Sequence, residues 1–350
     1  MKMKRLSFLL ALPLLISCSK GANATLEDYI SKITKSTDEF VVCTLSDIHL
    51  SSLSTVDEEL AYLEKCVYSK GKLEATNEKP DLIVLDGDVF MDTNKKVVDR
   101  FFSWIDSLNI PFAYTYGNHD LQNEYSNTYI DRKLKACKNS VLKNPIDNVY
   151  GDANYVVNMN KGNETLWQVY VFDSNTYYGF DYDVVHDDQI KWFADEADLA
   201  GNIPNIAFMH VPFEEFEEAW NELCDGKQGG GLDKNGNAYY MGEGVSNGYR
   251  ENDLYETMQK HNTKGVICGH DHINNTDWHY NKNGNGEIRL IYTEKSGRGI
   301  YHDTRMMGAM FVTLQSDGEF DLLRTSVKYA TDTVEEISSE MLASFPWMKA

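Results

Sequence analysis

The chain has 350 residues, of which 42% are hydrophobic and 25% are charged, so it can bury a sizeable core in one large domain or two modest ones. The formal net charge of −21 argues against a nucleic acid as a stable partner. It does not exclude a small anionic ligand, because a bound metal ion can reverse the sign of the local charge.

Residues 1–17 are expected to be a signal peptide rather than part of the fold. A basic start precedes an apolar run at 6–16 that is too short to span a bilayer. The run ends in "LISC", which resembles the lipobox of bacterial lipoproteins and implies lipid on Cys18. With Ser19 next and no acidic run behind it, we expect an outer-membrane lipoprotein that faces the periplasm and contacts the membrane through this lipid. Cleavage near "GANA", which gives a soluble secreted protein, is the alternative.

The next elements, taken in chain order, predict one α/β domain. Residues 18–37 are polar and are expected to be a tether, the domain should run from 38 to 330, and 331–350 should be a tail or a terminal helix. In the first part, strands at 40–45, 81–85 and 111–116 alternate with helices at 55–76 and 95–108, which indicates parallel strand pairs. The second part is richer in strands, expected at 154–159, 166–172, 205–210, 264–269, 287–293, 309–315 and 320–325, with a helix at 187–199. The first two of these strands are expected to form a hairpin.

Five cysteines follow Cys18, and they are widely spaced with no CxxC pair. An odd number in a chain of this size indicates buried free thiols rather than a disulfide framework or a zinc knuckle. They are Cys43, Cys66, Cys137, Cys224 and Cys268.

Polar residues of metal-ligand type follow five of the expected strands, in "SDIH", "DGD", "GNHD", "HVP" and "GHDH". Open α/β sheets place their sites at the carboxyl ends of the strands, so these side chains are expected to meet there. Residues two apart in an extended chain point to the same side, which predicts one cavity for Asp47 and His49. The same spacing separates His270 from His272. Each segment alone is a weak signal, since a strand-end Asp often caps a helix and a lone His such as His210 is more often structural.

Together, in the order D-x-H, G-D, G-N-H-D, H-x-P and G-H-x-H, the segments resemble the calcineurin-like metallophosphoesterases. The resemblance implies a two-sheet β-sandwich flanked by helices, with two metal ions at the carboxyl ends of the strands. Asp88 matches the carboxylate that bridges the two ions. The other ligands of one ion are matched by Asp47, His49 and His272, and those of the second by Asn118, His210 and His270. A ligand set of nitrogen and oxygen suits the divalent ions of Mn, Fe, Zn or Ni.

The resemblance also assigns the rest of "GNHD". His119 is similar to the general acid that protonates the leaving oxygen, and Asp120 would orient its imidazole. Met91 stands where purple acid phosphatases carry an iron-binding tyrosine, so a purple ferric centre is not expected.

Further segments, "HVPFEEFEEAW", "GHDHIN" and "YTEKSGRGIYH", look like the branch related to yeast Dcr2 and the plant purple-acid-phosphatase-like proteins. Residues 226–250 are long enough to form a lid over the site, or else a surface loop. In a lid, Tyr239, Tyr240 and Arg250 would meet the substrate. Arg298 would either hold a phosphate oxygen or form an exposed salt bridge.

The resemblance therefore predicts a dinuclear metal-dependent phosphoesterase that cleaves small phosphate monoesters, with a metal-bound hydroxide as nucleophile and His119 as acid. A phosphodiesterase acting on nucleotides or phospholipid headgroups is the alternative, because the motifs do not separate the two ester classes. An alternative of another class is a non-catalytic metal-dependent binding module on the same fold. The presence of every ligand and of the acid histidine speaks against it.

Overall fold

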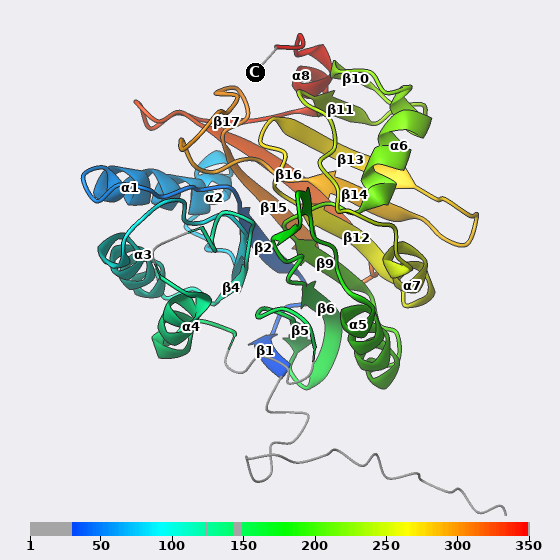
Figure 1. Ribbon diagram of the computed structural model, residues 1–350, viewed down its shortest axis with the longest axis horizontal. Coiled ribbons are helices and arrows are strands. Elements are labelled where there is room, and N and C mark those ends of the chain that lie inside the picture. Colours follow the sequence, from blue (N-terminus) through cyan, green and yellow to red (C-terminus); the bar gives the residue numbers. More distant parts are fainter. Residues whose placement is uncertain (1–29, 123–124, 143–148, 349–350) are drawn as a thin grey trace, which may run out of the picture.

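The computed structural model describes residues 30–122, 125–142 and 149–348. These residues form two large mixed β-sheets that share one apolar core and are flanked by helices (Figure 1). This confirms the predicted two-sheet α/β architecture. The expected signal peptide, Cys18 and the start of the expected tether lie outside the described residues.

The smaller sheet has six strands in the described part of the chain, and the half that ends at the edge strand β4 is parallel. Strands β2, β3 and β4 run parallel, while β15, β16 and β17 continue the sheet in antiparallel pairs. In sheet order the strands are β17 (Val334–Glu336), β16 (Phe320–Val327), β15 (Gly308–Leu314), β2 (Phe40–Leu45), β3 (Leu82–Asp86) and β4 (Phe112–Thr115).

The larger sheet has nine described strands, of which β6, β9, β12 and β14 run parallel. The expected hairpin is present as β5 and β6. In sheet order the strands are β1 (Ile30–Lys35), β5 (Tyr155–Lys161), β6 (Glu164–Val171), β9 (Asn205–Met209), β12 (Thr263–Cys268), β14 (Ile288–Tyr292), β13 (Asn274–Tyr280), β11 (Ala238–Met241) and β10 (Gly229–Leu232).

Helices cover the outer faces of both sheets (Figure 1). Beside the smaller sheet lie α1 (Val56–Val67), α2 (Ser69–Leu73), α3 (Lys95–Ser107) and α4 (Asn127–Ala136). Beside the larger sheet lie α5 (Asp187–Ala200), α6 (Glu214–Cys224) and α7 (Leu254–Lys260), and α8 (Ser339–Ser344) packs on β10 and β11. The single helix expected at 55–76 is two helices, because the chain leaves helical geometry at Tyr68. Among the described helices, none combines the length and apolar character needed to cross a bilayer.

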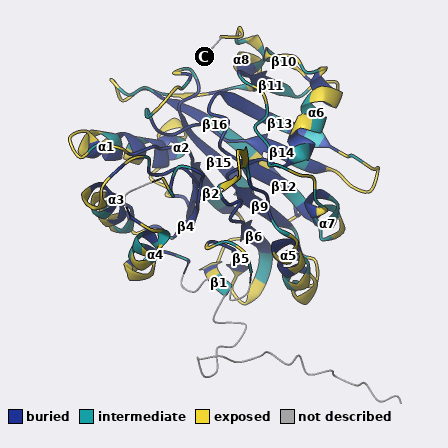
Figure 2. Ribbon diagram, in the orientation of Figure 1, coloured by how far each residue is buried: buried dark blue, intermediate teal, exposed yellow. Residues whose placement is uncertain are grey.

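The main core lies between the two sheets, and a second core lies between the larger sheet and its helices. Strand β9 shows both: Ile206 and Phe208 face the first core, and Ala207 and Met209 face the second. A strand buried on both faces needs a continuous apolar run, which is why these segments were readable from the sequence. Figure 2 shows the resulting pattern, with buried strands inside and exposed outer faces on the helices. The five cysteines expected to be free thiols are buried and free in the described structure.

The expected tether is wrong for its described part, because 30–35 is strand β1, paired in parallel with β5. In "ISKITK" the only apolar residues are Ile30 and Ile33, three positions apart, so the segment lacks the period-two alternation that marks a strand, and β1 was missed. The C-terminal segment does contain a helix, α8, but it also supplies β17 to the smaller sheet.

Ile33 gives a test of whether β1 belongs to the fold. Its side chain is buried, so Ile33→Ala should lower the free energy of unfolding by about 2 kcal/mol, measured by urea denaturation. Lys32→Ala, at an exposed position of the same strand, is the control and should change it by less than about 0.5 kcal/mol. If both variants and the wild type have the same free energy of unfolding, residues 30–35 do not contribute to the fold and the tether assignment is right.

Candidate metal centre

Five loops bring their polar side chains to one place at the carboxyl ends of β2, β3, β4, β9 and β12. Four of the ligand-type residues have left-handed backbones: Asp47 (φ 54°), His49 (φ 53°), Asp88 (φ 50°) and His270 (φ 70°). Such a conformation costs on the order of 1 kcal/mol or more for a residue with a Cβ, and it is typical of functional sites. Asp47 and His49 do share one cavity, but sharp turns place them there rather than the extended chain that we expected.

The ligand-type atoms form two adjoining groups that share one carboxylate. One group contains Asp47, His49, Asp88 and His272, and the other contains Asp88, His210 and His270; within each group the candidate atoms lie within 4.8 Å of one another. His210 Nε2 lies 3.2 Å from Asp88 Oδ2, and His272 Nε2 lies 3.3 Å from Asp47 Oδ1. Asn118 follows β4 into the same place, since its neighbour His119 donates its backbone N–H to Asp88 Oδ1 at 2.7 Å. We call these seven residues the ligand cluster.

The cluster passes a chemical test for metal binding, because many of its buried donor and acceptor atoms lack hydrogen-bond partners. Among the described residues, six buried atoms of the cluster are in this state: Asp47 Oδ1, His49 Nδ1, Asp88 Oδ2, Asn118 Oδ1, His210 Nε2 and His270 Nε2. Leaving buried polar atoms unpaired costs about 1–3 kcal/mol each. Carboxylate, amide and imidazole atoms that converge without partners are a donor set suited to divalent transition-metal ions.

Glycines in the motifs allow the loops to approach this closely. A Cβ on Gly117 would lie 2.2 Å from Asp88 Oδ1, so only glycine fits where the β4 loop passes Asp88. Gly87 has φ +83°, and a Cβ there would lie 2.4 Å from the His210 ring. The "GD" and "GNHD" glycines therefore serve mainly to bring ligands together, not only to form turns.

Without cations, the cluster balances its charge with a proton on His210. Burial opposes an imidazolium there, but the Asp88 carboxylate outweighs it and raises the pKa of His210 to about 10. Burial lowers the pKa of His49 to about 4, and burial together with His210 lowers the pKa of His270 to about 3. Metal binding would have to displace the His210 proton, which couples affinity to pH.

Backbone carbonyls and a buried lysine orient the cluster from behind. Asp86 O lies 2.8 Å from His210 Nδ1, which directs Nε2 of that ring into the site. His272 Nδ1 lies 3.3 Å from the backbone oxygen of Tyr301. Lys295 donates from Nζ to Asp47 O at 2.6 Å, and burial lowers its pKa to about 8. Lys295 was not among the site residues expected from the sequence, although it lies in the segment "YTEKSGRG".

His119 lies beside the cluster, with its ring edge-on to His49 at a centroid distance of 5.2 Å. The loop of His119 also contains Asp120, which was expected to orient the imidazole. The carboxylate of Asp120 accepts the backbone N–H groups of Phe90 (2.8 Å) and Gly117 (2.9 Å), while His119 Nδ1 pairs with Gln122 Oε1 at 2.7 Å. Asp120 therefore also holds the backbone of the loop, and Gln122 is a partner of the imidazole that was not expected.

A short hairpin, β7 (Tyr177–Tyr178) and β8 (Asp181–Tyr182), also contacts the cluster and was not foreseen. The Tyr177 hydroxyl accepts from Asn118 Nδ2 at 3.2 Å. The Tyr182 ring meets the His270 ring edge-on at 4.2 Å. The only sequence signal was the density of aromatic residues in "NTYYGFDYD".

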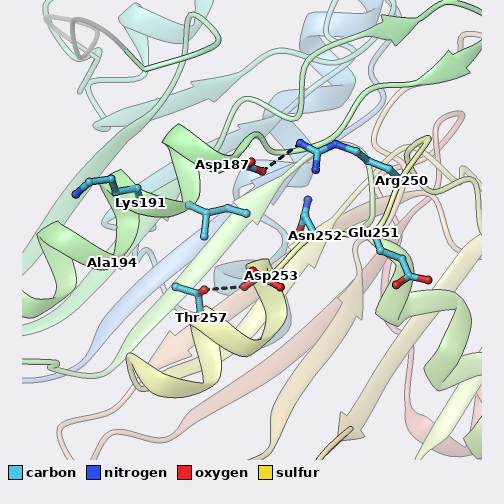
Figure 3. Close-up of a pocket in the computed structure, with 9 residues that line it drawn as sticks. Asp187, Lys191, Ala194, Arg250, Glu251, Asn252, Asp253 and Thr257 are labelled. Carbon is cyan, nitrogen blue, oxygen red and sulfur yellow. Dashed lines mark hydrogen bonds and ion pairs between the residues drawn. The ribbon is translucent and has the colours of Figure 1, made fainter.

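Two of the expected substrate contacts lie elsewhere. Tyr240 is fully buried, and its hydroxyl pairs with Pro346 O and Arg305 rather than facing the cluster. Arg250 donates to Asp187 at 3.1 Å and lines an open pocket of about 530 Å³ between α5 and α7, which includes no cluster residue (Figure 3).

Arg298 forms a salt bridge, which was one of the two roles that the sequence left open. Its guanidinium forms a salt bridge with Glu59 at 2.6 Å and packs over Tyr329. It also lines an open pocket of about 440 Å³ that reaches the cluster residue His49.

The segment 226–250, expected as a lid or a surface loop, contains two strands of the larger sheet. Strands β10 and β11 form an antiparallel hairpin on the edge of the larger sheet, with Tyr239 buried in its core, which excludes a mobile cover for this part. The following residues are fastened beside the cluster: Ser246 N donates to Asp271 at 3.1 Å, and Gly248 bridges to Tyr182.

The comparison with known proteins agrees with the fold and the cluster. Phosphatase DCR2 of Saccharomyces cerevisiae is 25% identical over 217 residues, which are 56% of this chain and 36% of that protein. Probable inactive purple acid phosphatase 28 of Arabidopsis thaliana is 25% identical over 235 residues, which are 57% of this chain and 55% of that protein. The chain thus spans about half or less of the length of these relatives.

Among solved structures, a dimetal phosphatase from Danio rerio is similar in fold, with a TM-score of 0.53 and 12% identity over 87% of this chain and 100% of that one. Residues 40–274, which include the whole ligand cluster, match the family described as calcineurin-like phosphoesterase. The chain belongs to the calcineurin-like phosphoesterase family.

Proposed function

We propose that this protein hydrolyses phosphate monoesters of small molecules with two divalent transition-metal ions, of Mn, Fe, Zn or Ni. The observation that carries the proposal is the pair of buried ligand groups that share Asp88. Asp88 would bridge the ions, Asp47, His49 and His272 would complete one site, and Asn118, His210 and His270 would complete the other. When bound, two such ions activate a water molecule and neutralise charge on the phosphoryl oxygens.

The residues of the chain supply orientation and a proton. Asn118 and the imidazoles hold the ions with little added negative charge, which leaves the site attractive to a phosphate. Gln122 Oε1 accepts from His119 Nδ1, so a protonated His119 would carry its second proton on Nε2. That proton can pass to the leaving oxygen as the P–O bond breaks, which is the role of a general acid.

Two alternatives remain in view. A phosphodiesterase would use the same ligands, and the choice between ester classes depends on groups around the substrate rather than on the cluster. The second alternative is a binding module without catalysis, which is suggested by the relatives that are named as inactive. The seven ligands and His119 favour catalysis here, because all eight lie together beside converging unpaired atoms.

The first test of the proposal is metal content. Wild-type protein should carry close to two ions per chain, and Asp88→Ala should lose both because each ligand group depends on this carboxylate. Elemental analysis of the purified, folded variants is the measurement, with Asp195→Ala on the exposed surface of α5 as the control. Full occupancy in Asp88→Ala would contradict the bridging role.

The second test concerns the proton donor. His119→Asn should retain metal but slow turnover by about 10²–10⁴-fold on an alkyl phosphate, with a smaller loss on p-nitrophenyl phosphate, whose leaving group needs little protonation. Gln122→Ala should show a milder form of the same pattern. His279→Asn, at a half-buried position on β13, is the control, and kcat is measured beside metal content. An equal loss on both substrates would remove the general-acid role.

We also propose that the protein is anchored in the cell envelope by lipid on Cys18, as an outer-membrane lipoprotein facing the periplasm. The support is the "LISC" segment that ends the apolar run. Wild-type protein should incorporate a metabolic fatty-acid label that Cys18→Ser does not, and Cys66→Ser is the control for other thiols. Absence of label from the wild type would leave the soluble secreted form.

A further inference from the structure

The hairpin of residues 176–183, which we call the aromatic hairpin, exposes aromatic rings beside a charged site. Tyr177, Tyr178 and Phe180 have exposed fractions of 42%, 59% and 103%. In Figures 1 and 2 it stands near the centre of the view, in front of the strands, with an exposed tip. Gathered exposed apolar side chains on a soluble domain usually mark a binding surface.

The aromatic hairpin is tied directly to the catalytic groups. The Tyr177 hydroxyl accepts from Asn118 Nδ2 at 3.2 Å and from Gln122 Nε2 at 3.4 Å. Asn118 is a proposed metal ligand, and Gln122 is the partner of His119 Nδ1. One tyrosine side chain thus spans the distance from the cluster to the exposed rings.

The rings are arranged with their faces parallel. Tyr178 stacks on Tyr249 with centroids 4.2 Å apart and an angle of 15° between the planes, and Tyr177 stacks on Tyr182 at 5.3 Å and 29°. The hairpin is held in this position by Tyr249 N, which donates to Tyr182 O at 2.9 Å. Parallel rings with exposed edges and faces form a platform for another flat group.

We propose that the aromatic hairpin, with Phe180 at its tip, stacks against the nucleobase of a nucleoside monophosphate whose phosphate lies at the ligand cluster. This rests on the proposed function and names its substrate class. A ribose separates base from phosphate in such a ligand, and in the protein the Tyr177 side chain lies between the cluster and the exposed rings. Stacking of a base on aromatic side chains needs no hydrogen-bonding groups, which fits a tip made only of rings and glycine.

A membrane surface is the other occupant that exposed aromatic residues suggest, and the charges disfavour it. Residues 176–183 contain Asp181 and Asp183 and no Lys or Arg, and the chain has a net charge of −21. Segments that bind anionic lipid surfaces are rich in basic residues. An uncharged base meets no such repulsion.

The experiment compares two phosphate monoesters that differ in the flat group. For metal-loaded protein, the ratio of kcat/KM for AMP to that for glycerol 2-phosphate is measured in the wild type and three variants. Phe180→Leu keeps an apolar side chain but removes the planar ring, and the ratio should fall about tenfold. Phe180→Trp restores a planar ring and should keep the ratio. Leu199→Ala, at an exposed apolar position on α5, should leave it unchanged.

The outcomes separate this proposal from the proposed function. A wild-type ratio near one, or an unchanged ratio in Phe180→Leu, would overturn the stacking site while leaving the phosphatase intact. If neither ester is hydrolysed by metal-loaded protein, the proposed function fails, and calorimetric binding of AMP, about tenfold weaker in Phe180→Leu, would still support the site. Sedimentation with phosphatidylglycerol vesicles that is lost in Phe180→Leu, without preference for AMP, would assign the tip to a membrane and overturn the proposal.

Discussion

The structure depends on burying two carboxylates, Asp47 and Asp88, where the carboxyl ends of strands from both sheets meet. Both are almost completely withdrawn from solvent, and burial of an unpaired carboxylate is costly unless positive charge or hydrogen bonds surround it. The protein supplies a proton on His210 and the Lys295 cation, which lies behind Asp47. This compensation is incomplete, because cluster atoms remain unpaired among the described residues. The remainder is the electrostatic argument for the two cations that we propose.

The two-sheet architecture is what brings enough ligands to these carboxylates. A single parallel sheet offers ligands from neighbouring strands only, whereas here β2, β3 and β4 come from one sheet and β9 and β12 from the other. The shared core locks the sheets together, so ligands distant in sequence hold fixed relative positions. Left-handed residues at Asp47, His49 and Asp88 add strain that this rigid frame can support.

Sequence patterns predicted the parts of the protein that repeat a simple physical rule. Strands buried on both faces, such as β9, have continuous apolar runs, and the ligands follow those strands directly. Strand β1 was missed because only Ile33 of its residues is buried, so its pattern resembles a polar segment. Asp120 was assigned to the His119 ring by resemblance, and its hydrogen bonds from two backbone N–H groups were not foreseen because they depend on tertiary geometry. Tyr240 was placed near the substrate because a glycine-rich segment resembled a loop, whereas the glycines belong to an edge strand, β10.

Ligand positioning and substrate contact are built on different kinds of element. The ligands stand on loops that follow central strands of both sheets, while the aromatic hairpin has only two-residue strands and belongs to neither sheet. Changes at Tyr178 or Phe180 therefore need not disturb the cluster. The hairpin can determine which leaving group is bound, while the cluster binds the phosphate. Tyr177 is the exception, because its hydroxyl contacts both Asn118 and Gln122. A ligand that shifts this ring would also shift the contacts of a metal ligand and of the residue paired with His119. In this way the position of a flat leaving group can influence proton delivery to it.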